Sequence, residues 1–195
     1  MREGPRRGEV AVEIRAFEAG DVPGLLRWID GFEALVLWTG PNRFRWPLDR
    51  AQLARYAAEA GTDLLIWSFV DHGAVVGHAS LAVDRAAGTA RLGRVLVAPE
   101  ARGRGLGEAV VRAAQRAAFA DPGTRRLTLG VYARNTGAVR LYERLGFVRE
   151  EGAGTQVLVN GVPWSSFEMA VTADAWRSAG PDEHAADRSG IEKRR

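Results

Sequence analysis

A glycine-rich loop between a predicted strand and a predicted helix limits the possible folds of this chain more than any other segment. The strand covers 89–97, and the segment 102–107, which reads RGRGLG, opens the helix. The first backbone N–H groups of a helix have no partner within it, and with the helix dipole they can hold a diphosphate. Glycines allow the backbone to approach phosphates closely, and Arg102 and Arg104 can add charge-assisted hydrogen bonds. The loop therefore predicts a phosphate site, and a plain strand-to-helix connection is the alternative.

Two common phosphate-binding motifs do not fit this loop. No Gly-Lys-Ser/Thr follows, so it is not a Walker A loop. The glycines are spaced Gly-x-Gly-x-Gly and begin several residues after the strand, whereas a dinucleotide fingerprint starts directly at the first strand of its domain. A nucleotide- or dinucleotide-binding protein that uses this loop stays open as a competing function.

The hydrophobic pattern around the loop predicts a mixed α/β (α+β) domain. Antiparallel hairpins flank a central strand–helix–strand unit, and Asn160-Gly161 is a hairpin turn signal. The predicted strands are 10–17, 64–70, 74–83, 89–97, 126–132, one starting at 147, 156–159 and 162–171. The predicted helices are 22–29, one from 49 to 61, 105–120 and 136–145.

The length of 195 residues suits one domain, which we place at 10–172, between a flexible leader at 1–9 and a polar, disordered tail at 173–195. No apolar run approaches the length of a membrane span, and no signal peptide is recognised, so we expect a soluble cytoplasmic protein without membrane partners.

The charged residues that give the net charge of +3 are scattered along the chain, and no nucleic-acid-binding motif occurs, so nucleic acid is not an expected partner. The chain has no cysteine, which excludes a disulfide framework, a thiolate metal site and a cysteine nucleophile. We expect no metal.

Two blocks of residues give a more specific indication. Val97 and Pro99 precede the loop, and 102–107 resembles the Gln/Arg-x-x-Gly-x-Gly/Ala loop of the GNAT (GCN5-related N-acetyltransferase) superfamily. Downstream, 135–147 reads NTGAVRLYERLGF and resembles the second block of that family, Asn-x-x-Ala-x-x-x-Tyr-x-x-x-Gly-Phe. The resemblance implies a GNAT-like acyl-CoA N-acyltransferase fold, in which the strand before the loop splays from its parallel neighbour.

The resemblance also implies an enzyme that transfers an acetyl group from acetyl-CoA to a primary amine. The strand before the loop would pair with the pantetheine arm of the cofactor, and the glycine loop would hold the pyrophosphate. Asn135 would contact the pantetheine arm, although an asparagine is also a common helix N-cap. Tyr142 would be the general acid that protonates the departing sulfur, with a core aromatic as the alternative. The implied cofactor-binding residues are Val95, Leu96, Val97, Arg102, Gly103, Arg104, Gly105, Leu106, Gly107, Asn135 and Tyr142.

The sequence offers several candidates for the general base. Many family members carry a glutamate on the strand before the loop, but 90–95 reads ARLGRV and has no carboxylate there. Glu33 is our candidate base, His78 and Glu168 are further candidates, and a water chain is another route. Because no cysteine can form an acetyl-enzyme, we expect direct attack in a ternary complex.

The acceptor side is marked by aromatic residues. Trp38, Phe44 and Trp46 straddle a Gly-Pro-Asn turn, and they either line an acceptor pocket or pack the first helices onto the sheet. The acceptor is a small-molecule or peptide amine. A catalytically weak acyl-CoA-binding or regulatory protein with the same fold is the alternative function. Dimers through the last strands are common in the family, so a homodimer is a further open expectation.

Overall fold

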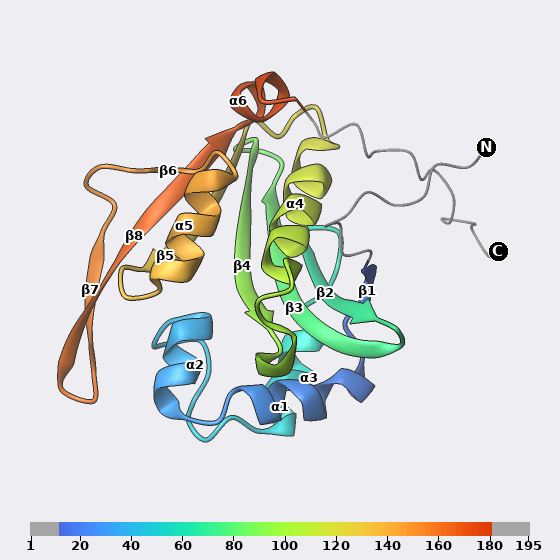
Figure 1. Ribbon diagram of the computed structural model, residues 1–195, viewed down its shortest axis with the longest axis vertical. Coiled ribbons are helices and arrows are strands. Elements are labelled where there is room, and N and C mark those ends of the chain that lie inside the picture. The colour runs from blue at the N-terminus through green and yellow to red at the C-terminus, as the bar shows by residue number, and fades with distance from the viewer. Residues whose placement is uncertain (1–11, 181–195) are drawn as a thin grey trace.

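Period-two hydrophobic segments form one eight-stranded sheet in the computed structural model, which describes residues 12–180 (Figure 1). The strands are β1 (Glu13–Ala16), β2 (Leu64–Asp71), β3 (Ala74–Asp84), β4 (Thr89–Val97), β5 (Arg126–Tyr132), β6 (Val148–Arg149), β7 (Thr155–Val159) and β8 (Val162–Thr172). The helices are α1 (Val22–Trp28), α2 (Phe32–Thr39), α3 (Arg50–Ala57), α4 (Leu106–Phe119), α5 (Thr136–Arg144) and α6 (Ala173–Ser178). Short 3-10 turns, η1 (Ala19–Asp21) and η2 (Pro99–Ala101), precede α1 and α4.

The strand order confirms the predicted mixed α/β class. Across the sheet it is β1-β2-β3-β4-β5-β8-β6, and β7 pairs with β8. β4 and β5 are parallel, and every other described pair is antiparallel. A parallel neighbour requires a crossover connection, which α4 supplies between these two strands.

The parallel pair is joined at one end only. Residues 89–91 of β4 face residues 126–128 of β5, and beyond Arg91 the two strands no longer pair. In Figure 1, β4 runs down toward α1 and α2, and α5 lies over β5. The predicted splayed pair is therefore confirmed, and it leaves backbone groups of β4 from Leu92 onward without a strand partner on the β5 side.

The helices hold this opening in place. α4 lies in front of β3 and β4 (Figure 1), and its own residues Val110, Val111 and Ala114 are almost completely buried. Asp49 caps α3 by accepting a hydrogen bond from the Gln52 N–H at 2.8 Å, which explains why this helix begins where the sequence predicts.

Two elements differ from the sequence prediction. α2 was not predicted, because its sequence FEALVLWT is apolar on most sides and shows no clear helical period. The tail predicted from 173 onward begins instead with α6, since Thr172 caps this helix and Trp176 packs against Phe119, with ring centroids 5.1 Å apart. The leader predicted at 1–9 and the tail residues 181–195 lie outside the described residues. No helix between residues 12 and 180 is long and apolar enough to cross a membrane.

Candidate functional site

A cleft of about 510 Å³ opens where β4 leaves β5. Its walls come from α1, α2, the end of β4, the glycine loop and the start of α5. All the predicted cofactor residues except Arg104 line it: Val95, Leu96, Val97, Arg102, Gly103, Gly105, Leu106, Gly107, Asn135 and Tyr142. The structure thus brings two motifs that are far apart in the sequence to one cleft.

The glycine loop bends around the first turn of α4. Gly103 has φ +77° and Gly105 has φ +80°, a region that side-chain-bearing residues rarely adopt. Gly107 allows α5 to approach, because a Cβ at this position would lie 3.2 Å from the Leu141 Cδ2 atom. The first turn of α4 therefore borders the cleft with small residues, which suits a diphosphate held by backbone N–H groups.

Arg104 points away from the cleft. Its Nη2 atom donates to the Asp71 carboxylate at 2.6 Å, and Asp71 also accepts from His72 at 2.7 Å. The Asp71 side chain is only 8% exposed, and a carboxylate with so little access to water needs a cationic partner. The Arg104 guanidinium hydrogen bond and that from His72 hold the Asp71 pKa below its usual value. In this arrangement Arg104 ties the glycine loop to the end of β2.

Asn135 and Tyr142 lie on the other wall. The Asn135 side chain accepts from the Ala138 N–H at 3.3 Å, so it is both the N-cap of α5 and a cleft residue. Tyr142 is 7% exposed and packs against Phe147, with ring centroids 5.9 Å apart. Burial raises the pKa of Tyr142 to about 12, so its phenol stays protonated at neutral pH.

A second cavity, of about 490 Å³, lies on the far side of α2 and is bounded by β3, β4, β5 and β8. Leu37 and Trp38 line both cavities, so they stand at the border between them. We call this second space the acceptor cavity, because Trp38, one of the residues predicted on the acceptor side, lines it. Its charged lining residues are Arg43, Glu59, Arg91, Arg94 and Glu168.

The three predicted acceptor-side aromatic residues have different positions. Trp38 is buried at the border of the cavities and stacks on Phe44, with ring centroids 5.5 Å apart and planes 13° from parallel. Phe44 is buried and lies outside both linings. Trp46 is 43% exposed and also lies outside both linings. Phe44 therefore fits the prediction that these aromatic residues pack the first helices onto the sheet, and Trp38 fits the prediction that they line a pocket.

β4 contains a bulge at the border of the cavities. Gly93 pairs with Ser80 and Leu96 with His78, so two β4 residues oppose Ala79 alone. Arg94, the first of these two, has φ +52°. Its carbonyl oxygen accepts a hydrogen bond from the Trp38 Nε1 atom at 2.8 Å, which fixes α2 to the bulge.

An ion pair crosses β5 at the point where β4 and β5 begin to part. Arg91 of β4 donates to both oxygens of Glu168 on β8, at 2.6 and 2.9 Å. The pair passes over Gly130 of β5, where a Cβ would lie 2.9 Å from Glu168 and 3.0 Å from Arg91. Gly130 is thus the residue that lets β4 and β8 be joined across β5.

The candidate bases do not share one location. Glu33 lies outside both cavity linings, and its carboxylate accepts from Asn160 at 3.2 Å. His78 is fully buried and lies 3.0 Å from the Tyr56 hydroxyl. Burial lowers the pKa of His78 to about 3, so its imidazole is neutral. Glu168 lines the acceptor cavity as the partner of Arg91.

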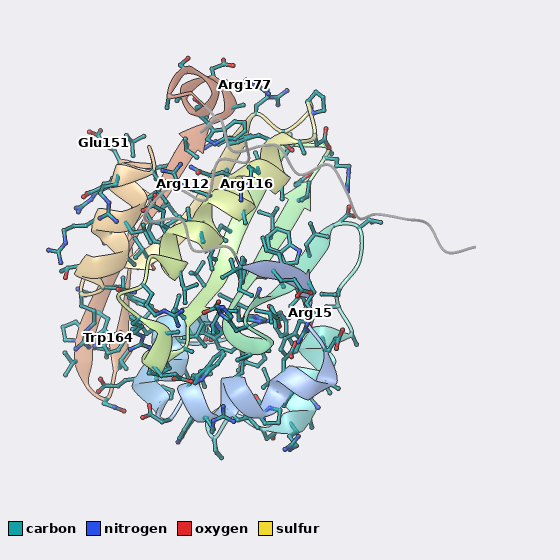
Figure 2. All side chains as sticks on the ribbon, turned by 45° about the vertical axis from the view of Figure 1, so that its right-hand side comes forward. Arg15, Arg112, Arg116, Glu151, Trp164 and Arg177 are labelled. Carbon is teal, nitrogen blue, oxygen red and sulfur yellow. The ribbon has the colours of Figure 1, made fainter. Side chains whose placement is uncertain are left out.

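The β7–β8 hairpin covers the outer side of α2. Trp164 lies on this hairpin (Figure 2) and joins Val36, Tyr132 and Val159 in a small hydrophobic cluster of its own. Thr155 and Val157 of the same hairpin line the acceptor cavity. The hairpin therefore forms one wall of that cavity.

Sequence reasoning missed two kinds of site residue. Leu37 was missed because α2 was not recognised as a helix. Arg94 was missed because a bulge places it in the acceptor cavity. Gly93 inside a strand was the available signal, since glycine within a strand often marks a bulge.

Comparison with known proteins agrees with this geometry. A family model described as the acetyltransferase (GNAT) family matches residues 32–147. Among solved structures, the chain is similar to spermidine N-acetyltransferase from Vibrio cholerae in complex with CoA and spermine, with a TM-score of 0.73 and 19% identity over 85% of this chain and 98% of that chain. A probable acetyltransferase is similar at a TM-score of 0.67 and 21% identity, over 87% of this chain and 98% of that chain. At these identities the solved structures show a shared fold.

Proposed function

The chain belongs to the GNAT acetyltransferase family, and on this basis we propose that it transfers an acetyl group from acetyl-CoA to a primary amine of small-molecule size. The observation that carries the proposal is the pair of cavities that meet at Leu37 and Trp38 beside the splayed strand β4. One cavity has a helix N-terminus and a free strand edge, which suit a phosphate-bearing thioester. The other is of the size that small molecules occupy.

The cofactor would be held by backbone groups more than by side chains. The N-terminus of α4 would bind the pyrophosphate, with Arg102 at the cleft wall adding charge. The pantetheine arm would lie along Val95, Leu96 and Val97, whose strand has lost its β5 partner. An N–H of this strand would donate to the thioester oxygen as negative charge develops on it.

Acetyl transfer would proceed by direct attack. The amine nitrogen forms a bond to the thioester carbon, the carbon–sulfur bond breaks, and the sulfur leaves with the electron pair. Tyr142 would donate its phenolic proton to that sulfur, and its buried, protonated state supports this role. The absence of cysteine from the sequence argues against an acetyl-cysteine intermediate.

The proton of the attacking amine needs an acceptor. Glu33 remains our candidate base, and because its carboxylate stands outside the acceptor cavity, the proton would reach it through water. A Glu33→Gln variant that keeps the full pH profile of kcat/KM would assign the proton to another group, such as Glu168, which lines the acceptor cavity.

The experiment that tests the function is an amine panel followed by release of free CoA, with Tyr142→Phe as the key variant. We expect kcat to fall by roughly 100-fold or more, since general acid catalysis contributes about 10²–10⁴. The dissociation constant for acetyl-CoA, measured by calorimetry, should stay within about threefold of the wild type.

Two outcomes would contradict the proposal. A Tyr142→Phe enzyme with undiminished kcat rejects the acid role. Tight binding of acetyl-CoA without acetylation of any amine favours a binding or regulatory protein instead.

A further inference from the structure

The acceptor cavity holds one more cation than it holds anions. Its carboxylates are Glu59 and Glu168, and each already has an arginine partner. Arg43 pairs with Glu59, and Arg91 forms the two-bond pair with Glu168. The remaining charged lining residue, Arg94, makes no ion pair with any carboxylate of residues 12–180.

The backbone bulge is what brings Arg94 into this cavity. In a regular strand Gly93 and Arg94 would face opposite sides of the sheet. Here both lie beside Ser80: a Cβ on Gly93 would be 3.3 Å from the Ser80 Oγ atom, and the Arg94 Nη1 atom donates to that oxygen at 2.9 Å. The bulge, with φ +52° at Arg94, therefore turns a side chain into the acceptor cavity at the cost of an unfavourable backbone conformation.

The surroundings of the Arg94 side chain orient it without neutralising it. Its Cζ atom lies 4.9 Å from the centre of the Tyr56 ring, and Ser80 accepts one of its hydrogen bonds. The Arg94 Nε atom is buried and has no hydrogen-bond partner among the described residues. His78 beyond Tyr56 is neutral and contributes no negative charge. A guanidinium that is stacked, held on one side and unpaired on the other is arranged to bind an anion.

We propose, on the basis of the function proposed above, that the acceptor is a primary amine that also carries a carboxylate, and that Arg94 is the residue that recognises this carboxylate. Arg94 is directly followed by Val95 and Leu96, which line the cofactor cleft. The carboxylate would thus lie close to the reacting nitrogen, as it does in an α-amino acid. The acceptor cavity of about 490 Å³ has room for such a molecule with its side chain.

The acceptor proposed here differs in charge from the polyamines named for similar structures. Spermidine and spermine carry only positive charges, and an unpaired guanidinium in the cavity would repel them. The two ion-paired carboxylates do not offset this repulsion, because each already has its arginine partner. We therefore expect polyamines to be poor acceptors for this protein.

The first test compares matched acceptors on the wild-type protein. The panel contains the common L-amino acids other than cysteine, the carboxamide of each, and spermidine, and CoA release is followed with a thiol reagent. The protein has no cysteine, so the reagent reports CoA alone. We expect kcat/KM for the best amino acid to exceed that of its carboxamide by roughly 10- to 100-fold, the range of one charge-assisted hydrogen bond. The carboxamide carries the less basic amine, with a pKa of about 8, so amine ionisation would favour the opposite order.

The second test compares Arg94→Gln with a matched control. Arg55→Gln removes the same charge from the exposed face of α3, outside both cavities. In Arg94→Gln we expect KM for the amino acid to rise by about 10-fold or more, with the carboxamide and the KM for acetyl-CoA changed by less than about threefold. The control should leave all of these values near those of the wild type.

The outcomes distinguish this inference from the proposed function. Equal or better use of carboxamides or spermidine by the wild type overturns the inference and leaves the acetyltransferase function standing. If no amine is acetylated, the proposed function fails. Binding of the same amino acids to the CoA-loaded protein, measured by calorimetry, then decides the inference: tighter binding than the carboxamides supports it, and no difference rejects it. Calorimetry on the wild type also decides the question should Arg94→Gln not fold.

Discussion

The hydrogen bond between Trp38 and the bulge can be measured by comparing two tryptophans. Trp38→Phe removes the indole N–H that donates to the Arg94 carbonyl oxygen at 2.8 Å. Trp28 is buried to a similar degree, 6% exposed against 7% for Trp38, and it also lines the cofactor cleft. Its Nε1 atom has no hydrogen-bond partner among residues 12–180. Trp28→Phe therefore removes the same atoms without removing a hydrogen bond.

The magnitude follows from this pairing. Both variants lose the same atoms from sites of similar burial, and phenylalanine keeps a ring that can stack on Phe44 at position 38, so most of the packing cost cancels in the comparison. Trp38→Phe additionally leaves the Arg94 carbonyl without its partner, which costs about 1–3 kcal/mol. We expect the free energy of unfolding of Trp38→Phe to lie below that of Trp28→Phe by that amount, equivalent to a Tm difference of roughly 2–12 °C in a domain of this size.

The assay is urea unfolding of both variants and the wild type, followed by the fluorescence of the remaining tryptophans, with Tm measured separately. If the bulge also positions the cleft residues that follow it, Trp38→Phe raises the KM for acetyl-CoA more than Trp28→Phe does. Equal stability of the two variants, within about 0.5 kcal/mol, would refute the reasoning, because the hydrogen bond would then contribute nothing.

Two further changes test other parts of the fold. Asp21 is buried and accepts from Arg15 at 2.7 and 2.8 Å and from Ser68 at 2.6 Å; burial would raise the Asp21 pKa, but these hydrogen bonds hold it below its usual value. A carboxyl group with a lowered pKa stabilises the fold above about pH 4, and this stabilisation is lost as the pH falls through the folded-state pKa. Asp21→Asn should therefore lower the free energy of unfolding by about 2–4 kcal/mol at pH 7 and by less near pH 3. Urea unfolding midpoints at the two pH values measure the difference. Gly103→Ala meets no atom within 4 Å but imposes φ +77° on alanine, so we expect a loss of about 1–2 kcal/mol and a raised KM for acetyl-CoA. Gly61→Ala, which has open space and no positive φ, is its control, and an equal loss there would contradict the argument.

The cofactor side could be predicted because its information is local. The glycine loop and the block from Asn135 to Tyr142 each consist of neighbouring residues. A helix N-terminus binds phosphate because its first backbone N–H groups are free and the helix dipole favours an anion there. The splayed pair followed from the family resemblance, and the β4–β5 register confirms it.

The acceptor side could not be predicted in the same way because its contacts are distant in sequence. The pair of Arg91 with Glu168 spans 77 positions, and the hydrogen bond of Trp38 to Arg94 spans 56. No local pattern indicates that Arg104 pairs with Asp71 or that a non-glycine residue adopts positive φ at the bulge. Only the folded sheet shows which of these side chains meet.

The splayed strands also affect how the protein avoids aggregation. Where β4 and β5 part, each strand presents unpaired backbone groups in the middle of the sheet, and such edges can recruit strands from other chains. The bulge at Arg94 interrupts the regular hydrogen-bonding row of β4, and charged residues at bulges are features that natural sheets use to protect exposed edges. The ion pair over Gly130 lies where this opening begins. We therefore expect the opening to resist the addition of a foreign β-strand.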